Sequence, residues 1–536
     1  MEKRNKLFIL LLIGLVLVGY INSLGNSFVS DDRGILINAQ SWDLSSVFSR
    51  PFTFLRPLLY LVTYKIAGFT PFLFRISNIA FHLGATLLIF YIVGKLANKK
   101  VAIVSAALFA AHPLLVESVT WISGGVYAQY SFFFLLSFWL YILSPKNKKN
   151  YIFSLVAYVC ALLSNEKAIP LALTFVVYEL SFGNLKKYWL KTSPYFILST
   201  LWVMFYFLNF ADRVSYLENQ GIDLAPYNPF FQIPIAISSY LQLIFWPSGL
   251  TIYHSEMIFT PLEFFIRVIV LLGLLGLIFY SLKRNKFIFF WLSFFIIALL
   301  ATINPLVHAW VVAERYAYLA SLGIFVSVAW VMVRLFKNRR QEKIAVALFA
   351  IVIAMLLVRT GIRNMDWRSE DTLWPATAKT SPSSAQNHNN LGDYYGRHGD
   401  MENSIREFKK AIELKPNYAE AYHNLGNAYR DRGQINNAIL SYKKALSITP
   451  SIWQSYQNIA GIYYGQGKYS QALEFLQKGL ALDKKNINLL FSEGIVYSKI
   501  GDKNRAGNSF HKILTIDPNN QLAKQALLQL QNGTSQ

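Results

Sequence analysis

Residues 416–450 read PNYAEAYHNLGNAYRDRGQINNAILSYKKALSITP, and the pattern of this stretch recurs along the last third of the chain. Prolines recur at multiples of 34 residues, at Pro382, Pro416, Pro450 and Pro518. Glycines and tyrosines keep the same interval, at Gly399, Gly433, Gly467 and Gly501 and at Tyr395, Tyr429, Tyr463 and Tyr497. A period of 34 residues is typical of a unit of two antiparallel helices, which buries its apolar face only by stacking on its neighbours.

The repeated part of the chain is therefore predicted to be an all-α tetratricopeptide solenoid. About four repeats fill residues 384–530, and residues 531–536 read as a polar tail. Stacked repeats of this kind form a groove wide enough for a peptide.

The first 362 residues are expected to form a polytopic membrane domain, joined to the repeats by a junction at 363–383. The chain is 54% hydrophobic and only 15% charged, whereas soluble proteins carry about 25% charged residues. Apolar runs near the roughly 20 residues needed to cross a bilayer recur throughout this part. Eleven spans are predicted, near 7–24, 77–95, 101–117, 125–143, 151–164, 168–183, 193–210, 263–282, 287–304, 316–335 and 343–361.

The net charge of +22 is distributed in a way that indicates membrane topology rather than nucleic-acid binding. Basic clusters fall in every second loop between the predicted spans, and such loops mark the cytoplasmic side. The N-terminus is therefore expected to be cytoplasmic, and an odd number of spans places the repeats on the exoplasmic side. The first apolar stretch has the basic start of a signal peptide but no convincing cleavage site, so we interpret it as a retained anchor. The apolar segment 231–247 is expected to lie in the interface; were it to cross, the repeats would change sides.

Ionisable residues embedded in apolar sequence collect in the loops that lack basic clusters. The first of these loops, residues 25–76, contains Asp31, Asp32 and Arg56, and later ones contain His112, Glu117, Glu166, Lys167, Glu314, Arg315 and Tyr316. Ionisable groups at membrane depth are costly and default to functional candidates. Their convergence predicts a polar cavity that opens on the same side as the repeats.

Most of these residues also have a purely structural interpretation. Asp31 and Asp32 would suit a solvated turn or a helix N-terminus. His112 and Glu117 would suit a hydrogen-bonded helix end, because they lack the spacing of a zinc motif. Glu166 and Lys167 would neutralise each other. Arg315 would pair with Glu314, or bind a phosphate in its forked geometry.

Several of these motifs, in this order, resemble the transmembrane and tetratricopeptide repeat O-mannosyltransferases and their bacterial relatives. The motifs are Phe28-Val29-Ser30-Asp31-Asp32, Arg56-Pro57-Leu58, His112-Pro113, Glu117 through Trp121, Asn165-Glu166-Lys167, and Glu314 through Tyr318, with Asn364, Trp367 and Leu373-Trp374 at the junction. The resemblance covers essentially the whole chain. It implies a GT-C glycosyltransferase fold and transfer of a sugar, mannose in this family, from a polyprenyl-phosphate carrier on the exoplasmic leaflet.

The resemblance also implies that Asp31 or Asp32 is the catalytic base on the acceptor hydroxyl. A lipid phosphate leaves readily when its charge is met by arginine or lysine, so we assign Arg315 and Lys167, or Arg56 instead, to the donor phosphate. The remaining residues are expected to shape the pocket: His112, Glu117, Glu166, Glu314 and Tyr316. Family members often continue Trp-Ile-Ser or Trp-Ile-Gly with Gly-Arg and an acid, whereas this chain continues Trp121-Ile122 with Ser123-Gly124-Gly125-Val126-Tyr127. The missing arginine and acid leave the sugar open. No cofactor is obligatory, although Asp31, Asp32 and Glu117 are of the type that binds a divalent cation.

The repeats carry one asparagine at equivalent positions of three units. Asn390, Asn424 and Asn458 resemble the asparagine ladder of the O-linked N-acetylglucosamine transferase, in which the amides hold a peptide backbone. An amide both donates and accepts, so it can bind backbone without requiring a particular sequence. The alternative is that these are ordinary helix-surface residues.

The expected function is therefore O-glycosylation of exported proteins, with the repeats binding acceptor or partner protein. A bacterial inner membrane is the expected location. Two alternatives stay open: transfer to a lipid or glycan acceptor, and a non-catalytic membrane-anchored scaffold. The spans exceed what an anchor requires. A transporter would show charged or broken helices near mid-membrane and duplicated halves, whereas the polar motifs lie near helix ends.

Overall fold

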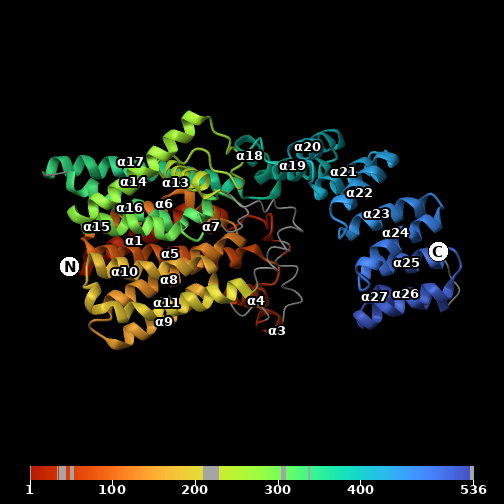
Figure 1. Ribbon diagram of the computed structural model, residues 1–536, viewed down its shortest axis with the longest axis horizontal. Coiled ribbons are helices and arrows are strands. Elements are labelled where there is room, and N and C mark those ends of the chain that lie inside the picture. Colours follow the sequence, from red (N-terminus) through yellow and green to blue (C-terminus); the bar gives the residue numbers. More distant parts are fainter. Residues whose placement is uncertain are drawn as a thin grey trace. The chain divides into compact units, whose positions relative to one another are not determined.

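The computed structural model describes residues 2–32, 34, 44–48, 53–208, 228–303, 310–335 and 338–531. Regular structure in these ranges is helical throughout, so the prediction of an all-α fold is confirmed. The chain divides into two compact units, which meet along the sequence between Ser381 and Pro382. Each unit is described by itself, and Figure 1 gives the element labels.

Long apolar helices, with short ones at their ends, make up the first unit. They are α1 (Glu2–Tyr20), α3 (Leu44–Phe48), α4 (Leu55–Ala67), α5 (Pro71–Leu96), α6 (Lys99–Ala111), α7 (Val116–Thr120), α8 (Val126–Leu143), α9 (Lys148–Ser164), α10 (Ala172–Ser181), α11 (Leu185–Leu208), α13 (Pro229–Phe245), α14 (Pro261–Arg284), α15 (Lys286–Leu299), α16 (Ala317–Leu335), α17 (Arg339–Asp366) and α18 (Glu370–Thr380). Short 3₁₀ turns join several of them: η1 (Ile21–Ser23), η2 (Pro113–Leu115), η3 (Ser123–Gly125), η4 (Glu166–Leu171) and η5 (Glu314–Tyr316). Helices α5, α6, α8, α15 and α16 pack on one another at the centre.

A helix lies at each of the eleven predicted span positions. Six helical segments are long and apolar enough to cross a membrane: Asn5–Ser23, Pro71–Leu96, Ser123–Leu143, Pro261–Arg284, Glu314–Leu335 and Arg339–Asp366. A seventh is a bent pair, because the predicted span 101–117 breaks at His112, where α6 and the following turn meet at 54°. The number of helices that cross stays a prediction. The segment predicted to lie in the interface forms the 17-residue helix α13.

Helices α14 and α17 differ from the central ones in their surroundings. Only 6% and 11% of their apolar windows are buried, against 72% for the window that contains α16. A helix that is apolar all round and uncovered by protein suits a hydrocarbon environment. We therefore expect these two helices to face lipid.

The second unit is the repeat solenoid. Four helix pairs follow one another: α19 (Ala385–Arg397) with α20 (Met401–Leu414), α21 (Ala419–Asp431) with α22 (Ile435–Ile448), α23 (Trp453–Gly465) with α24 (Tyr469–Leu482), and α25 (Ile487–Lys499) with α26 (Lys503–Ile516). A single helix, α27 (Gln521–Gln531), covers the last pair and buries Ala523 and Ala526 against it.

The periodic residues of the repeats have a direct structural reason. Gly399, Gly433, Gly467 and Gly501 adopt φ of 78°, 76°, 71° and 82° in the turn between the two helices of each pair. This left-handed region is open to glycine at no steric cost. The carbonyl of the preceding tyrosine accepts the N–H five residues on, for example Gln434 to Tyr429 at 2.8 Å, and this bond closes the turn.

Candidate functional site

The outer-loop motifs lie in short helices and turns where the long helices of the first unit end. Glu117 is on α7, Lys167 on η4, and Glu314 through Tyr316 on η5. Element η5 contacts both α7 and η2, and α7 contacts η3. In Figure 1 the short helices α3, α4 and α7 lie at the end of this unit opposite the N-terminus.

The loop that carries Asp31 and Asp32 is anchored to neighbouring helices. Arg75 on α5 donates to the carbonyls of Asn26 at 2.7 Å and Ser27 at 3.1 Å, and to that of Thr120 at 2.8 Å. The Asn26 amide donates to the carbonyl of Asn364 on α17 at 2.9 Å. These hydrogen bonds join segments from the start and the end of the first unit beside Asp31 and Asp32.

The two acids of the doublet have different environments. Asp32 is fully buried: its Oδ1 accepts from the backbone N–H of Ser123 at 2.9 Å and from its hydroxyl at 2.6 Å, and its Oδ2 accepts from the Val29 N–H at 3.3 Å. Burial raises the pKa of Asp32 to about 6, against the opposing effects of these bonds and of the Arg75 charge. Asp31 follows Ser30, which adopts φ of 53°, and retains access to solvent. Surrounding protein raises the pKa of Asp31, and the opposing charge of Arg315 and a hydrogen bond from Ser30 limit the increase.

Arg315 pairs with Glu117 rather than with its sequence neighbour Glu314. The Glu117 carboxylate accepts from the Arg315 guanidinium and, at 2.8 Å, from its backbone N–H. Glu117 is fully buried, whereas 13% of the Arg315 side chain is exposed. The guanidinium is thus held from one side and retains some access from the other.

Lys167 and Arg315 both lie against the ring of Tyr316. The Lys167 Nζ is 5.0 Å from the ring centroid and the Arg315 Cζ is 5.2 Å from it. The Lys167 side chain is largely buried, and within the described residues its ammonium has no ion pair. A buried cation without a counter-charge favours binding of an anion. Glu166, the neighbouring residue, is half-buried.

Arg56 has a different environment. Its guanidinium donates to the Ile122 carbonyl at 2.6 Å, to Asn78 at 2.8 Å and to Gln129 at 3.2 Å, and lies 4.5 Å from the Tyr60 ring centroid. These neutral partners place Arg56 beneath the turn that follows Trp121.

Both ring nitrogens of His112 have backbone partners. Nε2 donates to the Ile244 carbonyl at 2.9 Å, and Nδ1 accepts from the Leu114 N–H at 3.2 Å. His112 therefore fastens the end of α6 to α13 and presents no free nitrogen.

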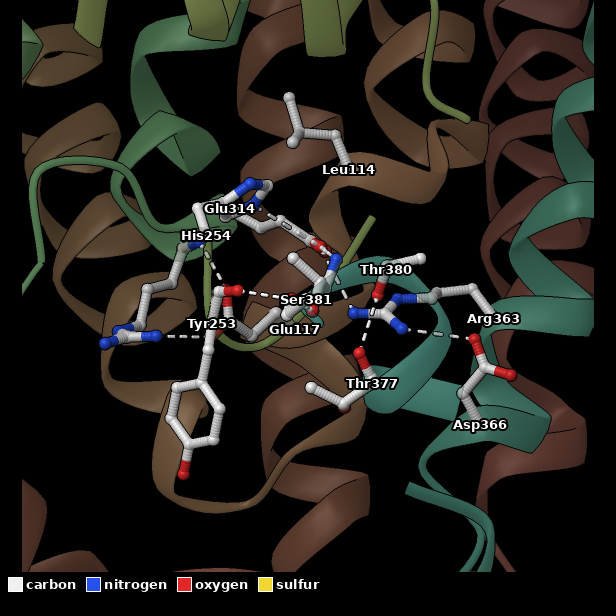
Figure 2. Close-up of polar contacts among 12 residues, drawn as sticks. Leu114, Glu117, Tyr253, His254, Glu314, Arg363, Asp366, Thr377, Thr380 and Ser381 are labelled. Carbon is white, nitrogen blue, oxygen red and sulfur yellow. Dashed lines mark hydrogen bonds and ion pairs between the residues drawn. The ribbon is translucent and has the colours of Figure 1, made fainter. Parts of the chain in front are cut away.

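Glu314 belongs to a second buried cluster, shown in Figure 2. Its Oε1 accepts from Arg363 at 3.2 Å and from the Thr251 N–H, and Arg363 also donates to Asp366 at 3.1 Å. The Nε2 of His254 is 3.9 Å from the same oxygen. Burial and the charges of Arg363 and Arg315 lower the pKa of His254 to about 3, so this ring is neutral and the contact is not an ion pair.

Several residues of these clusters were absent from the sequence predictions: Arg75, Asn78, Ser123, His254, Arg363 and Asp366. A charge inside an apolar helix would have indicated Arg75. Arg363 lies just beyond the predicted end of the last span and reads as a flanking residue. Nothing in the sequence singles out Asn78 or His254, and Ser123 was noted only as part of the run that departs from the family pattern.

No group of three or more His, Cys, Asp or Glu among the described residues is arranged to hold a metal ion. Glu117, one of the residues considered for such a site, is engaged by Arg315. The lone cysteine, Cys160, lies in α9 with a free thiol.

The repeat unit contains a groove of about 710 Å³. Helices α21 to α25 line it, with the polar side chains Arg430, Gln457, Asn458, Gln466 and Ser492 and with Ile435, Leu476, Phe491, Ile495 and Val496. Of the three predicted ladder residues, Asn458 lines this groove, and its amide donates to Asn427 of the preceding repeat at 2.8 Å. Asn424 similarly donates to Asn389 at 3.0 Å, and Asn390 is half-buried on α19.

Two comparisons with protein families agree with the repeat assignment. A model described as "TPR repeat" matches residues 392–430 and 426–467, and one described as "Tetratricopeptide repeat" matches residues 454–484. Among solved structures, that of MamA is 26% identical to this chain with a TM-score of 0.26, and the match covers 28% of this chain and 81% of that one.

Curated relatives match both units. Protein O-mannosyl-transferase TMTC3 from Homo sapiens is 24% identical over 473 residues, which covers 76% of this chain and 51% of that protein. Protein O-mannosyl-transferase F38B6.6 from Caenorhabditis elegans is 24% identical over 462 residues, which covers 76% of this chain and 62% of that protein. The resemblance inferred from the motifs is thereby confirmed, and the chain spans about half the length of the first curated relatives it matches.

Proposed function

We propose that this chain is a membrane glycosyltransferase that moves a mannose from a polyprenyl-phosphate donor to serine or threonine hydroxyls of exported proteins. The observation that carries the proposal is the arrangement around Arg315. The Arg315 and Lys167 side chains both lie against the ring of Tyr316, and the Arg315 charge limits the rise in the pKa of Asp31 that burial causes. The names of the relatives, protein O-mannosyl-transferases, support the choice of sugar and of a protein acceptor.

The proposed reaction is a single displacement at the anomeric carbon of the donor. The acceptor oxygen forms a bond to that carbon while the bond from carbon to phosphate oxygen breaks. Asp31 takes the hydroxyl proton as the bond forms, because a hydroxyl is a poor nucleophile without a positioned base. The phosphate leaves with the bonding electrons, and Arg315 and Lys167 stabilise its negative charge.

The raised pKa of Asp31 suits this role. A carboxylate with an ordinary pKa is a weak base, whereas one whose pKa is raised towards the working pH accepts a proton more readily. Glu117 holds the Arg315 guanidinium in place from the buried side. In this assignment Arg56 supports the loop structure instead of binding phosphate.

The repeats are proposed to recruit acceptor or partner protein on the exoplasmic side. The groove between α21 and α25 combines apolar walls with amide and hydroxyl side chains, which is the composition expected of a peptide site. The amides of Asn424 and Asn458 already donate to neighbouring repeats. In this groove the Gln457 amide likewise donates to Ser492, at 2.9 Å, so the side-chain carbonyl oxygens of Asn458 and Gln457 are the groups offered to a peptide.

A transfer assay tests the proposed function. Membranes from cells that produce the wild-type chain or Asp31→Asn, at matched protein levels, are incubated with polyprenyl-phosphate mannose carrying a radiolabel in the sugar. Label in β-eliminable sugar on protein, lost in the variant, supports the proposal. Label in a lipid or glycan fraction would redirect the acceptor. Equal label in both membranes would favour a non-catalytic scaffold.

A further inference from the structure

The turn Ser123–Gly125, which has no assigned role, makes the main contact with the buried acid of the doublet. Asp32 receives three hydrogen bonds, and two of them come from Ser123, through its backbone N–H at 2.9 Å and its hydroxyl at 2.6 Å. Both act on the same carboxylate oxygen. The remaining bond, from the Val29 N–H to the other oxygen, is longer at 3.3 Å.

Buried side chains also hold the two residues that precede this turn. The Ile122 carbonyl accepts from Arg56 at 2.6 Å and from the Tyr60 hydroxyl at 3.1 Å, and Asn78 donates to the Trp121 carbonyl at 3.1 Å. These buried donors leave the residue before Ser123 little freedom.

Glycine is required at both positions after Ser123. A Cβ on Gly124 would lie 2.3 Å from the Glu117 carbonyl oxygen, and one on Gly125 would lie 1.9 Å from the Asn78 side-chain oxygen. Atoms cannot approach so closely, so any other residue would displace the turn. The turn that presents Ser123 is therefore packed closely against Glu117 and Asn78.

Fixing Asp32 also fixes Asp31, because the two are adjacent on the backbone. Ser30 adopts a left-handed conformation with φ of 53°, and the Asp32 N–H donates to the Val29 carbonyl at 3.2 Å, which closes a turn over Val29–Asp32. The backbone on both sides of Asp31 is thus defined. The Asp31 carboxyl remains accessible and interacts with the charge of Arg315.

We infer that Ser123 is a positioning residue, which holds the Asp32 carboxylate through its hydroxyl and backbone N–H and thereby directs Asp31 towards Arg315 and the donor. The inference rests on the proposed function and adds to it a residue that acts through Asp32. Ser123 stands where the resembling family has serine or glycine, and Gly125 and Val126 stand where it has arginine and an acid.

The charged and titratable groups around the doublet make a pH readout informative. Arg75 and Tyr60 interact with Asp32, and Arg315 interacts with Asp31. The Ser123 hydroxyl stabilises the ionised form of Asp32, so its removal favours protonation. In this arrangement Asp32 acts in its ionised form, so loss of the Ser123 hydroxyl is expected to move the acid limb of the activity profile to higher pH.

The experiment compares three variants of the full chain in the mannose-transfer assay. Ser123→Ala removes the hydroxyl, Ser123→Thr keeps it, and Ser137→Ala removes a buried hydroxyl from the same helical segment, where it donates to the Ser154 carbonyl at 2.7 Å. A hydrogen bond to a charged group contributes enough to predict a fall in kcat of about 10- to 100-fold for Ser123→Ala. The KM for polyprenyl-phosphate mannose is expected to stay within about twofold of wild type, because Arg315 and Lys167 are unchanged.

The expected pattern is a low kcat and a shifted acid limb in Ser123→Ala alone. Wild-type kcat in Ser123→Ala overturns the inference, as does an equal loss in Ser123→Thr or in Ser137→Ala, because each would show that the hydroxyl has no specific role. A rise in KM without a fall in kcat also contradicts it. Absence of transfer by the wild-type chain removes the proposed function itself, and this inference with it.

Discussion

The two units of this chain hold their charged side chains in different ways. In the first unit, Glu117 pairs with Arg315, 198 residues away, and Glu314 pairs with Arg363, 49 residues away, and all four side chains are at most 13% exposed. In the repeat unit, ion pairs such as Glu474–Lys478 and Asp393–Arg397 join residues four positions apart on exposed helix surfaces. Helical geometry alone brings the second kind together. The buried pairs of the first unit form only because the packing of the long helices brings distant residues together.

Breaking a buried pair should therefore lower the stability of the fold, whereas breaking an exposed pair should not. Arg363→Met leaves Glu314 buried beside Thr251 and His254 without its guanidinium. Breaking a buried pair from one side costs about 3–5 kcal/mol. We expect a large drop in the thermal unfolding temperature of the detergent-solubilised chain.

Two controls sharpen that result. Adding Glu314→Gln to Arg363→Met should recover much of the loss, because no buried charge then remains unpaired. Lys478→Met, which breaks an exposed pair in the repeats, should leave the unfolding temperature unchanged. Similar losses for Arg363→Met and Lys478→Met would contradict the comparison.

Substitution of an acid should lower the transfer activity strongly in the first unit and leave it unchanged in the repeat unit. Asp31→Asn is expected to lower mannose transfer at least 100-fold, about 2.7 kcal/mol, because the amide cannot accept the hydroxyl proton. The control Asp393→Asn replaces an exposed acid of the first repeat and should transfer at the wild-type rate. Full activity of Asp31→Asn in a quantitative transfer assay would remove Asp31 as the base.

Within the repeats, a substitution that disturbs packing between the two helices of a pair should lower stability more than the loss of an exposed charge. A Cβ on Gly426 would lie 2.6 Å from the Tyr442 ring, whereas one on Gly461 would meet nothing within 4 Å. Gly426→Ala is expected to destabilise by about 1–3 kcal/mol through overpacking. Gly461→Ala, also inside a helix, should stabilise by up to about 1 kcal/mol.

Hydrogen exchange reports these two glycine variants locally. Amides of α21 and α22 should exchange faster in Gly426→Ala, and those of α23 should be unchanged or slower in Gly461→Ala. Equal effects of the two substitutions would mean that the close approach of Tyr442 is unimportant.

The smallest expected difference concerns two histidines with opposite pH dependence. In the repeats, the His388 Nδ1 donates a hydrogen bond to the Glu407 carboxylate at 2.7 Å, and this bond raises the pKa of His388 above 6.5. Its stabilising contribution is therefore present below pH 6.5 and is lost as pH rises through the folded-state pKa. The pKa of Glu407 is lowered by the same contact, so its contribution is lost only as pH falls through that lowered value. In the first unit the pKa of His254 is lowered to about 3, so stability there falls as pH drops below 6.5.

Hydrogen exchange at pH 6 and pH 8, corrected for the intrinsic rates, distinguishes the two. Protection of α19 and α20 should decrease modestly at pH 8, and His388→Gln should abolish that change. Protection of α19 and α20 that is independent of pH in the wild-type chain would show that the His388–Glu407 contact contributes nothing.

Much of the fold was predictable because it follows local rules. The 34-residue period identified the helix pairs, and each periodic glycine occupies a left-handed turn. Apolar runs located a helix at every predicted span position. The break at His112 was missed, because the predicted span ran through Pro113 to residue 117 while α6 ends at Ala111. Proline at the start of the following turn has no N–H to continue the helix.

The candidate site was predictable only in part. Charge embedded in apolar sequence singled out Glu117, Arg315, Lys167 and the acid doublet, since ionisable groups at membrane depth are costly. The sequence did not predict how these residues pair. Residues adjacent in the chain were expected to pair, Glu314 with Arg315 and Glu166 with Lys167. In an η5 turn, successive side chains point in different directions, so Glu314 and Arg315 join separate clusters.

By itself the sequence determined that the chain is helical, that its last third is a repeat solenoid, that its first part carries spans of bilayer length, and which family it resembles. Periodicity and hydropathy are properties of short windows, and they persist however the windows pack. Tertiary structure alone decided that Asp32 is buried against Ser123 while Asp31 stays accessible, that Glu117 holds Arg315, and that Lys167 lies against Tyr316. These contacts join residues up to 198 positions apart, and only the packing of the helices brings such residues within hydrogen-bonding distance.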